Sequence, residues 1–522
     1  MNAIIDSDEQ SKVIHAPVDD DLLVVAGAGS GKTYTMTRRI IELIRQDVAP
    51  ERILGLTFTR KAAGELSERV SAAVLGDREH GDDDCMFLKP AVYTYDAFFQ
   101  TIVRQYGLLV GFDQNTQPLS AAGAMQLAND VIDRHLSEYL GMDDDKVGGL
   151  SSLASSLLEL SNAINSAMIG GDCIGVDDAI ERIRRWDRAF VERVRRAIGD
   201  EPMPDKLNNV KIPEHQDGMT EQTWRKSVDR LRSKLPKLHE NCVSHCGQLI
   251  STAERRELLL DLVADYTAEK RRLNMAEFGD FTVAAYQLVT RFPSIGRRYR
   301  RRFSHVLLDE YQDTSTTQAA LIAALFHPAS DDGADRCAVN AVGDPFQSIY
   351  AWRGASPGAF RMFQRDFGLP ADKKPYALTV TRRNSRIVLE AANVLTTPLR
   401  TSPRRPSSAS MREVGVAPLD NIPQAATGTV GVLGYDTLGQ QIDGVVRFCR
   451  EAIRRNTVTD AQGHVHRGTV AVLFRAKTAM PAYQDALEQA GLTTFAVGYS
   501  ALLERPEVLD LLALLHAVAD HT

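Results

Sequence analysis

The sequence has 522 residues, of which 44% are hydrophobic and 25% are charged, and its formal net charge is −7. This length predicts several domains, the composition is ordinary for globular proteins, and the charge argues against a surface that is basic throughout. No apolar run is long enough to span a membrane, and the first ten residues lack a signal-peptide pattern. Together with six scattered cysteines, these features predict a cytoplasmic protein that does not bind membranes.

The first hundred residues alternate strand patterns with helix patterns. The continuous apolar run at 22–25 is typical of a buried parallel strand, and apolar spacing predicts a helix at 33–45. A second strand is expected at 53–58, a helix at 60–74 and a third strand at 91–99. This alternation predicts an α/β fold with a parallel sheet.

The sheet is expected to resume only after a long helical insertion. Residues 105–302 are rich in Leu, Ala, Arg and Glu and contain few strand signals. Strand patterns return at 303–310 and 337–344, and again at 376–380. The first α/β domain is therefore expected in two parts, 1–104 and 303–386, on either side of the insertion.

A second α/β region is expected towards the end of the chain. Residues 387–428 contain a helix pattern and then a Pro-, Ser- and Arg-rich stretch, which indicates a linker or a surface loop. The region 429–522 follows. Its predicted strands lie at 428–435, 468–475 and 493–498, and its predicted helices at 482–491 and 505–518.

The stretch AGAGSGKT follows the first strand and opens the first helix. It matches a phosphate-binding loop except at its first position, where an alanine replaces glycine. Glycines allow backbone N–H groups to face phosphate oxygens, the lysine supplies a charge to the β and γ phosphates, and the threonine hydroxyl can bind Mg²⁺. A chance Gly-rich turn is much less favoured in this context. The nucleotide-binding residues are therefore Ala26, Gly27, Ala28, Gly29, Ser30, Gly31, Lys32 and Thr33.

Two adjacent carboxylates, Asp309 and Glu310, follow the apolar run at 306–308. Ligands bind at the carboxyl ends of parallel strands, so these acids are expected beside the phosphate loop. Asp309 would hold Mg²⁺, and Glu310 would act as the base for the attacking water. The alternative is an acidic strand cap without chemistry.

Several motifs in this order resemble the UvrD/Rep/PcrA-type superfamily 1 DNA helicases, and the resemblance covers nearly the whole chain. SDEQ resembles the adenine-reading Q motif, LTFTRKAA motif Ia, LLDEYQDTS motif II and AVGDPFQSIYAWRGA motif III, which is the most specific match. VYTYDAFF and TRRNSRIVLEAAN stand in the places of motifs Ib and IV. The resemblance implies a P-loop RecA-like motor domain followed by a second motor domain.

The resemblance also implies roles for individual residues. Gln10 would read adenine, Gln312 and Gln347 would link the γ-phosphate to the DNA groove, and Arg383 would reach the γ-phosphate. Phe58, Tyr350 and Trp352, with Arg353 beside them, match positions that contact single-stranded DNA. Stacking on aromatic rings is independent of base sequence, which suits a motor that moves along any strand. Core packing of Tyr350 and Trp352 is the alternative.

Two features depart from the family pattern. The motif IV sequence Asn-Tyr-Arg is replaced by Thr381, Arg382 and Arg383. A guanidinium plane can also stack on a base, so Arg382 is expected to take the place of the adenine-stacking ring. The family's motifs V and VI would lie beyond residue 522, so the second motor domain is expected to be incomplete.

The expected function is that of an ATP-dependent 3′–5′ DNA helicase or translocase, an ATP hydrolase that acts in DNA repair or recombination. ATP and Mg²⁺ are the expected cofactors. Single-stranded DNA and duplex junctions are the expected partners, with a possible partner subunit. The alternatives are a P-loop ATPase that is not a helicase, and a fragment that binds ATP and DNA without unwinding.

Overall fold

The structure is a computed structural model of the chain. It describes residues 6–76, 89–135, 150–167, 173, 175–199, 219–328, 336–356, 358–370, 374–401, 415–459, 463–496 and 506–519. The chain forms two compact units, Met1–Thr429 and Val430–Thr522. The domain boundaries expected from the sequence remain a prediction.

The first unit contains a parallel sheet of six strands in the order β3-β2-β6-β7-β1-β8. Its central strands are buried along their whole length, which explains their continuous apolar sequences. The α/β fold with a parallel sheet and a phosphate loop is therefore confirmed. The strands are β1 (Leu22–Ala26), β2 (Ile53–Thr57), β3 (Ala91–Thr94), β6 (His305–Leu308), β7 (Ala338–Gly343) and β8 (Tyr376–Leu378).

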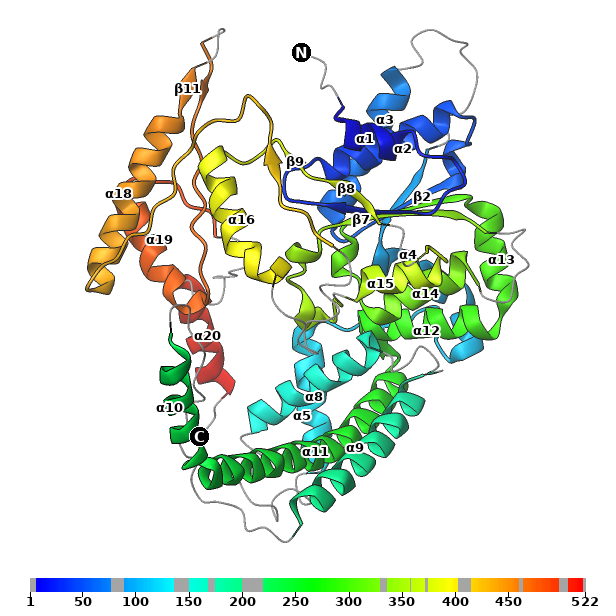
Figure 1. Cartoon of the computed structure of the whole chain (residues 1–522). Helices are drawn as coiled ribbons and strands as arrows, with labels where there is room; N and C mark the ends of the chain where they lie inside the picture. Colours follow the sequence, from blue (N-terminus) through cyan, green and yellow to red (C-terminus); the bar gives the residue numbers. More distant parts are fainter. Residues whose placement is uncertain are drawn as a thin grey trace. The chain divides into compact units, whose positions relative to one another are not determined.

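Helices cover both faces of this sheet (Figure 1). On one face, apolar side chains of the first three helices pack against β1 and β2; these helices are α1 (Asp8–Ile14), α2 (Lys32–Arg45) and α3 (Arg60–Gly76). The larger core lies on the other face. The helices there are α4 (Tyr95–Tyr106), α12 (Phe278–Arg291), α13 (Pro293–Arg302), α14 (Thr316–Phe326) and α15 (Ala359–Asp366).

The third strand is shorter than its sequence pattern suggests. Residues 91–99 were expected to form one strand, but β3 ends at Thr94 and α4 begins at Tyr95. The Thr94 hydroxyl accepts a hydrogen bond from the amide of Ala97 and so caps the helix. Tyr95, Phe98 and Phe99 are all buried in the core. Their aromatic composition resembles a strand, whereas their burial follows the helical period.

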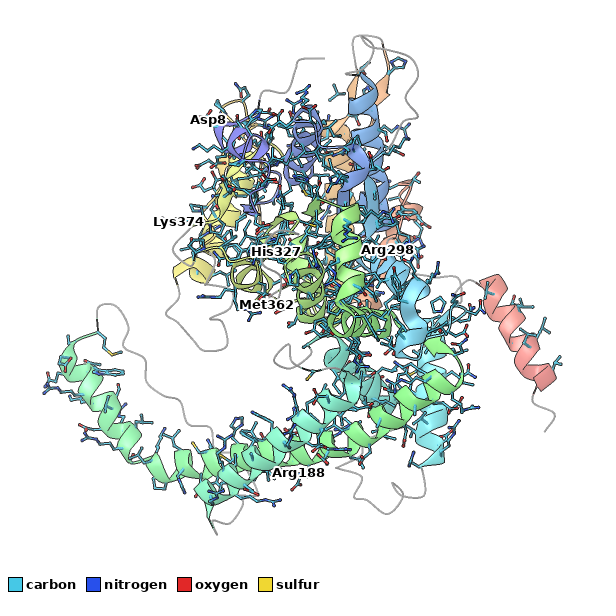
Figure 2. The ribbon with its side chains drawn as sticks, turned by 90° about the vertical axis from the view of Figure 1, so that its right-hand side faces the viewer. Asp8, Arg188, Arg298, His327, Met362 and Lys374 are labelled. Atoms are coloured by element: carbon cyan, nitrogen blue, oxygen red, sulfur yellow. The ribbon has the colours of Figure 1, made fainter. Side chains whose placement is uncertain are left out.

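The insertion between β3 and β6 is helical, as expected. Its own core joins α5 (Ala121–Arg134), α8 (Leu150–Ser166), α9 (Val176–Ile198) and α11 (Leu235–Arg272). Ion pairs link the outer helices; Arg188 of α9, labelled in Figure 2, lies 3.6 Å from Glu257 of α11. A short helix, α10 (Glu221–Arg232), precedes α11. The strands β4 (Gln117–Pro118) and β5 (Met275–Ala276) pair in parallel with each other within the insertion.

The first unit ends with a segment that forms a separate two-stranded sheet. After β9 (Val380–Thr381) comes α16 (Arg386–Thr401), which confirms the helix expected there. Residues 402–414, the centre of the predicted linker, lie outside the described residues. Beyond them β10 (Asp420–Asn421) pairs with β9 in parallel.

The second unit contains helices, but the described residues show none of its three expected strands. Residues 428–435, 468–475 and 493–496 have no regular structure, and residues 497 and 498 lie outside the described part. Apolar side chains there are open to solvent; Val432 is 97% exposed. A strand exists only with a hydrogen-bonded neighbour, and these segments have none among the residues that can be described. The elements present are α18 (Leu438–Asn456), β11 (Val458–Thr459), β12 (Val465–His466), α19 (Met480–Gln489) and α20 (Pro506–Ala519).

Of these helices, α19 and α20 were expected and α18 was not predicted. Within the described ranges, no helix has both the length and the apolar character needed to cross a membrane.

Candidate nucleotide and nucleic-acid site

The phosphate loop, residues 26–33, connects β1 to α2. Gly29 and Gly31 have φ angles of 76° and 88°, in the left-handed region that favours glycine. The Ser30 hydroxyl donates to the carbonyl of Gly27 over 2.8 Å and closes the turn. Lys32 is the first residue of α2. The loop therefore presents its backbone amides at a helix N-terminus, an arrangement that suits an anion.

Gln10 is held against this loop from α1. Its side-chain amide donates to the carbonyl of Ser30 over 3.1 Å, while its side-chain carbonyl accepts from the amide of Ser7 over 3.0 Å. The guanidinium of Arg382 lies 3.5 Å from the same oxygen of Gln10. The two residues expected at the adenine end are thus adjacent.

The carboxyl end of β6 brings Asp309 and Glu310 to the loop, as expected. Lys32 Nζ lies 3.2 Å from Glu310 Oε2. Glu310 has φ 49° and ψ 45°, a left-handed conformation that is uncommon outside glycine and costs roughly 1–3 kcal/mol. Its amide donates to Asp309 Oδ1 over 2.9 Å. A strained, hydrogen-bonded turn therefore aims the Glu310 carboxylate at the lysine.

Carboxyl groups crowd this end of the sheet. Burial, and then the charge of Glu310, raise the pKa of Asp309 to about 6. The same two causes raise the pKa of Asp313 to about 6. Asp309 and Asp313 therefore hold their protons more tightly than they would in water. A cation bound at this end of the sheet would offset the crowded negative charge.

The donor set suits a magnesium ion. The Thr33 hydroxyl and the Asp309 carboxylate are hard oxygen ligands, the type that Mg²⁺ takes together with phosphate oxygens and water. Asp309 is 2% exposed and receives only one amide, from Glu310, among the hydrogen bonds of the described residues. The described residues contain no group of three or more His, Cys, Asp or Glu side chains arranged for a metal.

The turn that carries Asp309 and Glu310 is called the acidic turn. Gln312 joins it to the segment after β7. Its side-chain amide donates to Glu310 Oε2 over 2.7 Å, and its side-chain carbonyl accepts from the amide of Asp344 over 2.9 Å. Asp344 also accepts from Gln347 Nε2 over 2.7 Å. The hydroxyl of Ser348 donates to the carbonyl of Gln312. One hydrogen-bonded network therefore runs from Glu310 to Gln347.

The segment after β9 closes on the loop at Gly29. The amide of Arg382 donates to the Gly29 carbonyl over 2.9 Å. A methyl group on Gly29 would lie 2.6 Å from the Cβ of Arg383 and 2.5 Å from the hydroxyl of Thr381. Position 29 therefore requires a glycine for two reasons, the positive φ angle and the close approach of this segment. Both arginine side chains are exposed.

The four residues expected to contact DNA form a separate aromatic cluster. The rings of Phe58 and Tyr350 are 4.9 Å apart, and those of Tyr350 and Trp352 are 6.3 Å apart. The guanidinium of Arg353 lies 4.6 Å from the Trp352 ring. Trp352 is 68% exposed, so the alternative of core packing is wrong for this residue, whereas Tyr350 is half-buried.

Some residues at this site had not been singled out from the sequence. Glu9 accepts hydrogen bonds from the amide and hydroxyl of Thr379 and holds the chain before β9. Leu419 packs on Gly27, where an added methyl group would meet its side chain at 2.3 Å. Asp344 lies in GDPFQ, which is part of the motif III stretch, so the sequence pointed to this residue. No sequence pattern indicated that Leu419, beyond the linker, would contact Gly27.

A cavity of about 210 Å³ lies beside the phosphate loop. Gly27, Gln347, Asn393, Arg400 and Leu419 are among the residues that line it. Space for a ligand therefore adjoins the network that contains Gln347.

The fold and this site define a P-loop RecA-like motor domain. A comparison with protein families finds the UvrD/REP helicase N-terminal domain over residues 6–368. The chain therefore belongs to the UvrD/REP helicase family.

Curated relatives align along nearly the whole chain. It is 27% identical over 518 residues to ATP-dependent DNA helicase UvrD1 of Mycobacterium tuberculosis, covering 98% of this chain and 52% of the relative. It is 24% identical over 505 residues to ATP-dependent DNA helicase PcrA of Bacillus subtilis, covering 96% and 52%. It is 24% identical over 520 residues to DNA helicase II of Rickettsia typhi, covering 98% and 59%. The chain spans about half the length of these relatives.

Proposed function

We propose that the chain binds ATP at the phosphate loop and single-stranded DNA at the aromatic cluster, and that it couples ATP hydrolysis to movement along DNA. The observation that carries this proposal is the network Glu310–Gln312–Asp344–Gln347, which starts at the acidic turn and leads into the segment that bears Tyr350 and Trp352. Membership of the UvrD/REP helicase family and the names of its relatives support the same function.

At the nucleotide, the chain's own groups divide into binding and chemical roles. The amides of residues 29–33 and the Lys32 ammonium would hold the phosphates, and Gln10 with Arg382 would hold the base. Glu310 would accept a proton from the attacking water, since a general base must lie within hydrogen-bond reach of that proton. Gln347 and Arg383 would contact the γ-phosphate.

Thr33 and Asp309 would hold Mg²⁺, which when bound neutralises charge on the β and γ phosphates. Binding of ATP would draw Lys32 from Glu310 to the phosphates. Glu310 would then remain hydrogen-bonded to Gln312. A movement of Glu310 would therefore be transmitted through Gln312 to the segment that carries the aromatic cluster.

At the DNA, the open face of Trp352 and the neighbouring Tyr350 and Phe58 would stack on bases. Stacking contributes about 1–3 kcal/mol per base and requires no particular sequence. Arg353 would add a phosphate or cation–π contact. We also propose that the movement along DNA is 3′–5′ and that duplex junctions are substrates. A role in DNA repair or recombination and a cytoplasmic location remain predictions.

The proposal is tested by measuring ATP hydrolysis with and without a 20-nucleotide oligothymidylate. The expected result is Mg²⁺-dependent hydrolysis that rises when the oligonucleotide is added. Hydrolysis that ignores DNA would leave a P-loop ATPase that is not a helicase. Binding of both ligands without turnover would instead support a binding protein.

A further inference from the structure

The insertion contacts the segment that carries the aromatic cluster, through the last turn of α8. Asn162 Nδ2 donates to the main-chain carbonyl of Trp352 over 3.3 Å. Two residues further on, a methyl group on Gly354 would lie 2.1 Å from the Cβ of Ser166. The segment 350–354 therefore rests directly on α8, although about 190 residues separate them in the sequence.

Buried polar contacts with α12 and α14 fix the same turn of α8. The side-chain amide of Asn165 donates to Asp280 of α12 over 3.0 Å, and the carbonyl of Asn165 accepts from the hydroxyl of Thr317 over 2.7 Å. Thr317 belongs to α14, which begins just after the acidic turn. The turn of α8 therefore has a fixed position relative to the site.

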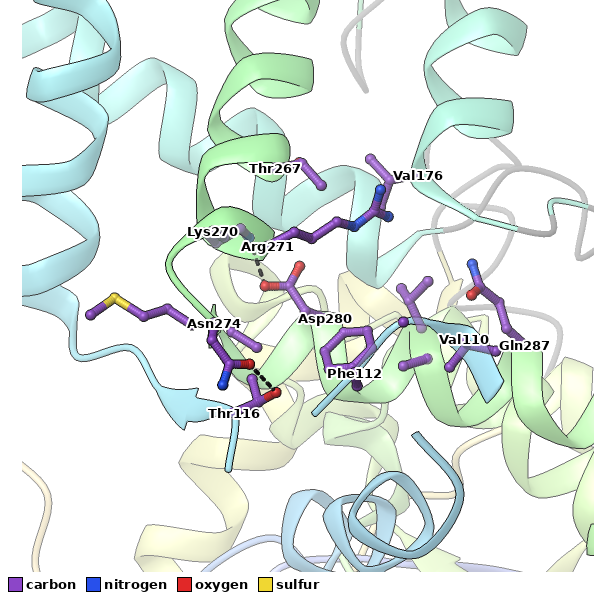
Figure 3. A pocket seen from close by; sticks show the side chains of 15 residues that line it. Val110, Phe112, Thr116, Val176, Thr267, Lys270, Arg271, Asn274, Asp280 and Gln287 are labelled. Carbon is purple, nitrogen blue, oxygen red and sulfur yellow. Dashed lines mark hydrogen bonds and ion pairs between the residues drawn. The ribbon is translucent and has the colours of Figure 1, made fainter. Parts of the chain in front are cut away.

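Lys270 at the end of α11 completes this anchor. Its ammonium is 2% exposed and donates to Asp280 over 2.7 Å and to Glu277 over 2.8 Å. Figure 3 shows Lys270 and Asp280 bonded at the edge of a cavity of about 40 Å³, with Thr116 and Asn274 bonded nearby. A buried cation between two carboxylates resists displacement, because separating them would leave uncompensated charge.

The two residues that follow segment 350–354 are held in place as well. Ala355 forms a bridge with Ser315, and the amide of Ser356 donates to the carbonyl of Thr314 over 3.1 Å. Gly354 turns the chain with φ 88°. The segment therefore contacts α8, and the two residues that follow it contact Thr314 and Ser315.

We propose that the last turn of α8 holds segment 350–354 in the conformation that binds DNA, with Asn162 and Ser166 as positioning residues. This inference rests on the proposed binding of single-stranded DNA by Trp352. It gives the helical insertion a role at the site, because Asn162 and Ser166 belong to the insertion and hold the segment that carries Trp352.

The test compares Asn162→Ala and Ser166→Leu with the wild type. Asn162 is exposed, so its replacement removes one hydrogen bond without opening the core. We expect it to weaken binding of a 20-nucleotide oligothymidylate by about two- to tenfold. Ser166→Leu drives a larger side chain against Gly354, and we expect a loss of about tenfold or more. Affinity for Mg-ATP without DNA should stay within about twofold, since neither residue contacts the nucleotide site.

Three controls separate positioning from a general defect. Ser152→Leu puts the same side chain at an exposed place on α8 and should leave DNA binding unchanged. Asn162→Gln keeps the amide donor and should restore most of the affinity. With Trp186 and Trp224 replaced by Phe, Trp352 is the sole tryptophan, and its emission should shift in Asn162→Ala and Ser166→Leu.

Unchanged DNA affinity and unchanged Trp352 emission in both variants would overturn the inference. So would a parallel loss of ATP and DNA binding, which would indicate a folding defect. If the wild type does not bind DNA, the proposed function fails, whereas the emission of Trp352 still reports whether α8 positions the segment.

Discussion

Lys32 Nζ lies 3.2 Å from Glu310 Oε2, so the lysine of the phosphate loop is paired with the carboxylate proposed as the base. The two residues come from α2 and from the end of β6, 278 positions apart in the sequence. Phosphate oxygens of a bound nucleotide would compete with this carboxylate for the lysine. Nucleotide binding and the freedom of Glu310 are therefore linked by one contact.

Replacing Lys32 with alanine is expected to abolish ATP hydrolysis and to weaken nucleotide binding, because the phosphates lose their main side-chain partner. Isothermal titration with a non-hydrolysable ATP analogue and a steady-state hydrolysis assay measure the two effects. Lys226→Ala, at an exposed position of α10, is the control and should behave as the wild type. Near-normal hydrolysis by Lys32→Ala would contradict the assignment of the phosphate loop.

Replacing Glu310 with glutamine is expected to retain ATP binding and to reduce turnover by about 10²–10⁴-fold, the typical contribution of general-base catalysis. The amide keeps the shape of the side chain and its contact with Gln312, but it cannot accept the proton. Single-turnover rates and analogue affinity, measured on the same preparation, separate the two effects. If affinity fell together with the rate, Glu310 would be a structural residue or a metal ligand.

Replacing Trp352 with alanine is expected to weaken single-stranded DNA binding by about 1–3 kcal/mol, to a similar extent for different base sequences. The ring is 68% exposed, so its removal should leave the unfolding temperature nearly unchanged. Trp186→Ala, at another exposed tryptophan, is the matched control. Fluorescence anisotropy with oligothymidylate and a mixed sequence measures the effect. Equal affinities for the variant and the wild type would remove Trp352 from the DNA site.

Replacing Asp309 with asparagine is expected to change how stability depends on pH. Burial, and then Glu310, raise the pKa of Asp309 to about 6, above its value of about 3.9 in an unfolded chain. Between these values the folded state holds more protons than the unfolded state, so the free energy of unfolding falls as pH rises. Without ligand, Asp309→Asn should therefore be more stable at pH 7.5, by an amount on the order of 1–3 kcal/mol, and this advantage should shrink towards pH 4.

Thermal melts across this pH range check that expectation. The exposed control Asp229→Asn should follow the wild type. Adding Mg²⁺ with an ATP analogue should stabilise the wild type more than Asp309→Asn, because the carboxylate is the proposed ligand. Parallel melting curves at all pH values, with equal stabilisation by Mg²⁺, would argue against a buried metal-binding carboxylate at this position.

The sequence alone determined the α/β class, the phosphate loop and the acidic turn. Each depends on neighbours along the chain: a continuous apolar run for β1, glycines where φ is positive, and carboxylates directly after β6. Local chemistry fixes such features, so a short stretch of sequence contains the whole signal.

Residues 91–99 and the expected strands of the second unit were decided by tertiary contacts. The aromatic residues after Thr94 fit a strand by composition, but a threonine cap and one buried helix face make them α4. Residues 428–435 have a strand composition without a neighbouring strand among the described residues. Propensity is a weak prior where pairing or burial can override it.

The contacts between distant segments also required the tertiary structure. The sequence named Trp352 and left its environment open; the fold makes it exposed and sets it on Asn162 of the insertion. Leu419 reaches Gly27 from beyond the linker, and Lys270 lies between Glu277 and Asp280 at the end of α11. Sequence spacing does not predict such contacts. They depend on how the helices pack and on where the chain beyond the linker pairs with β9.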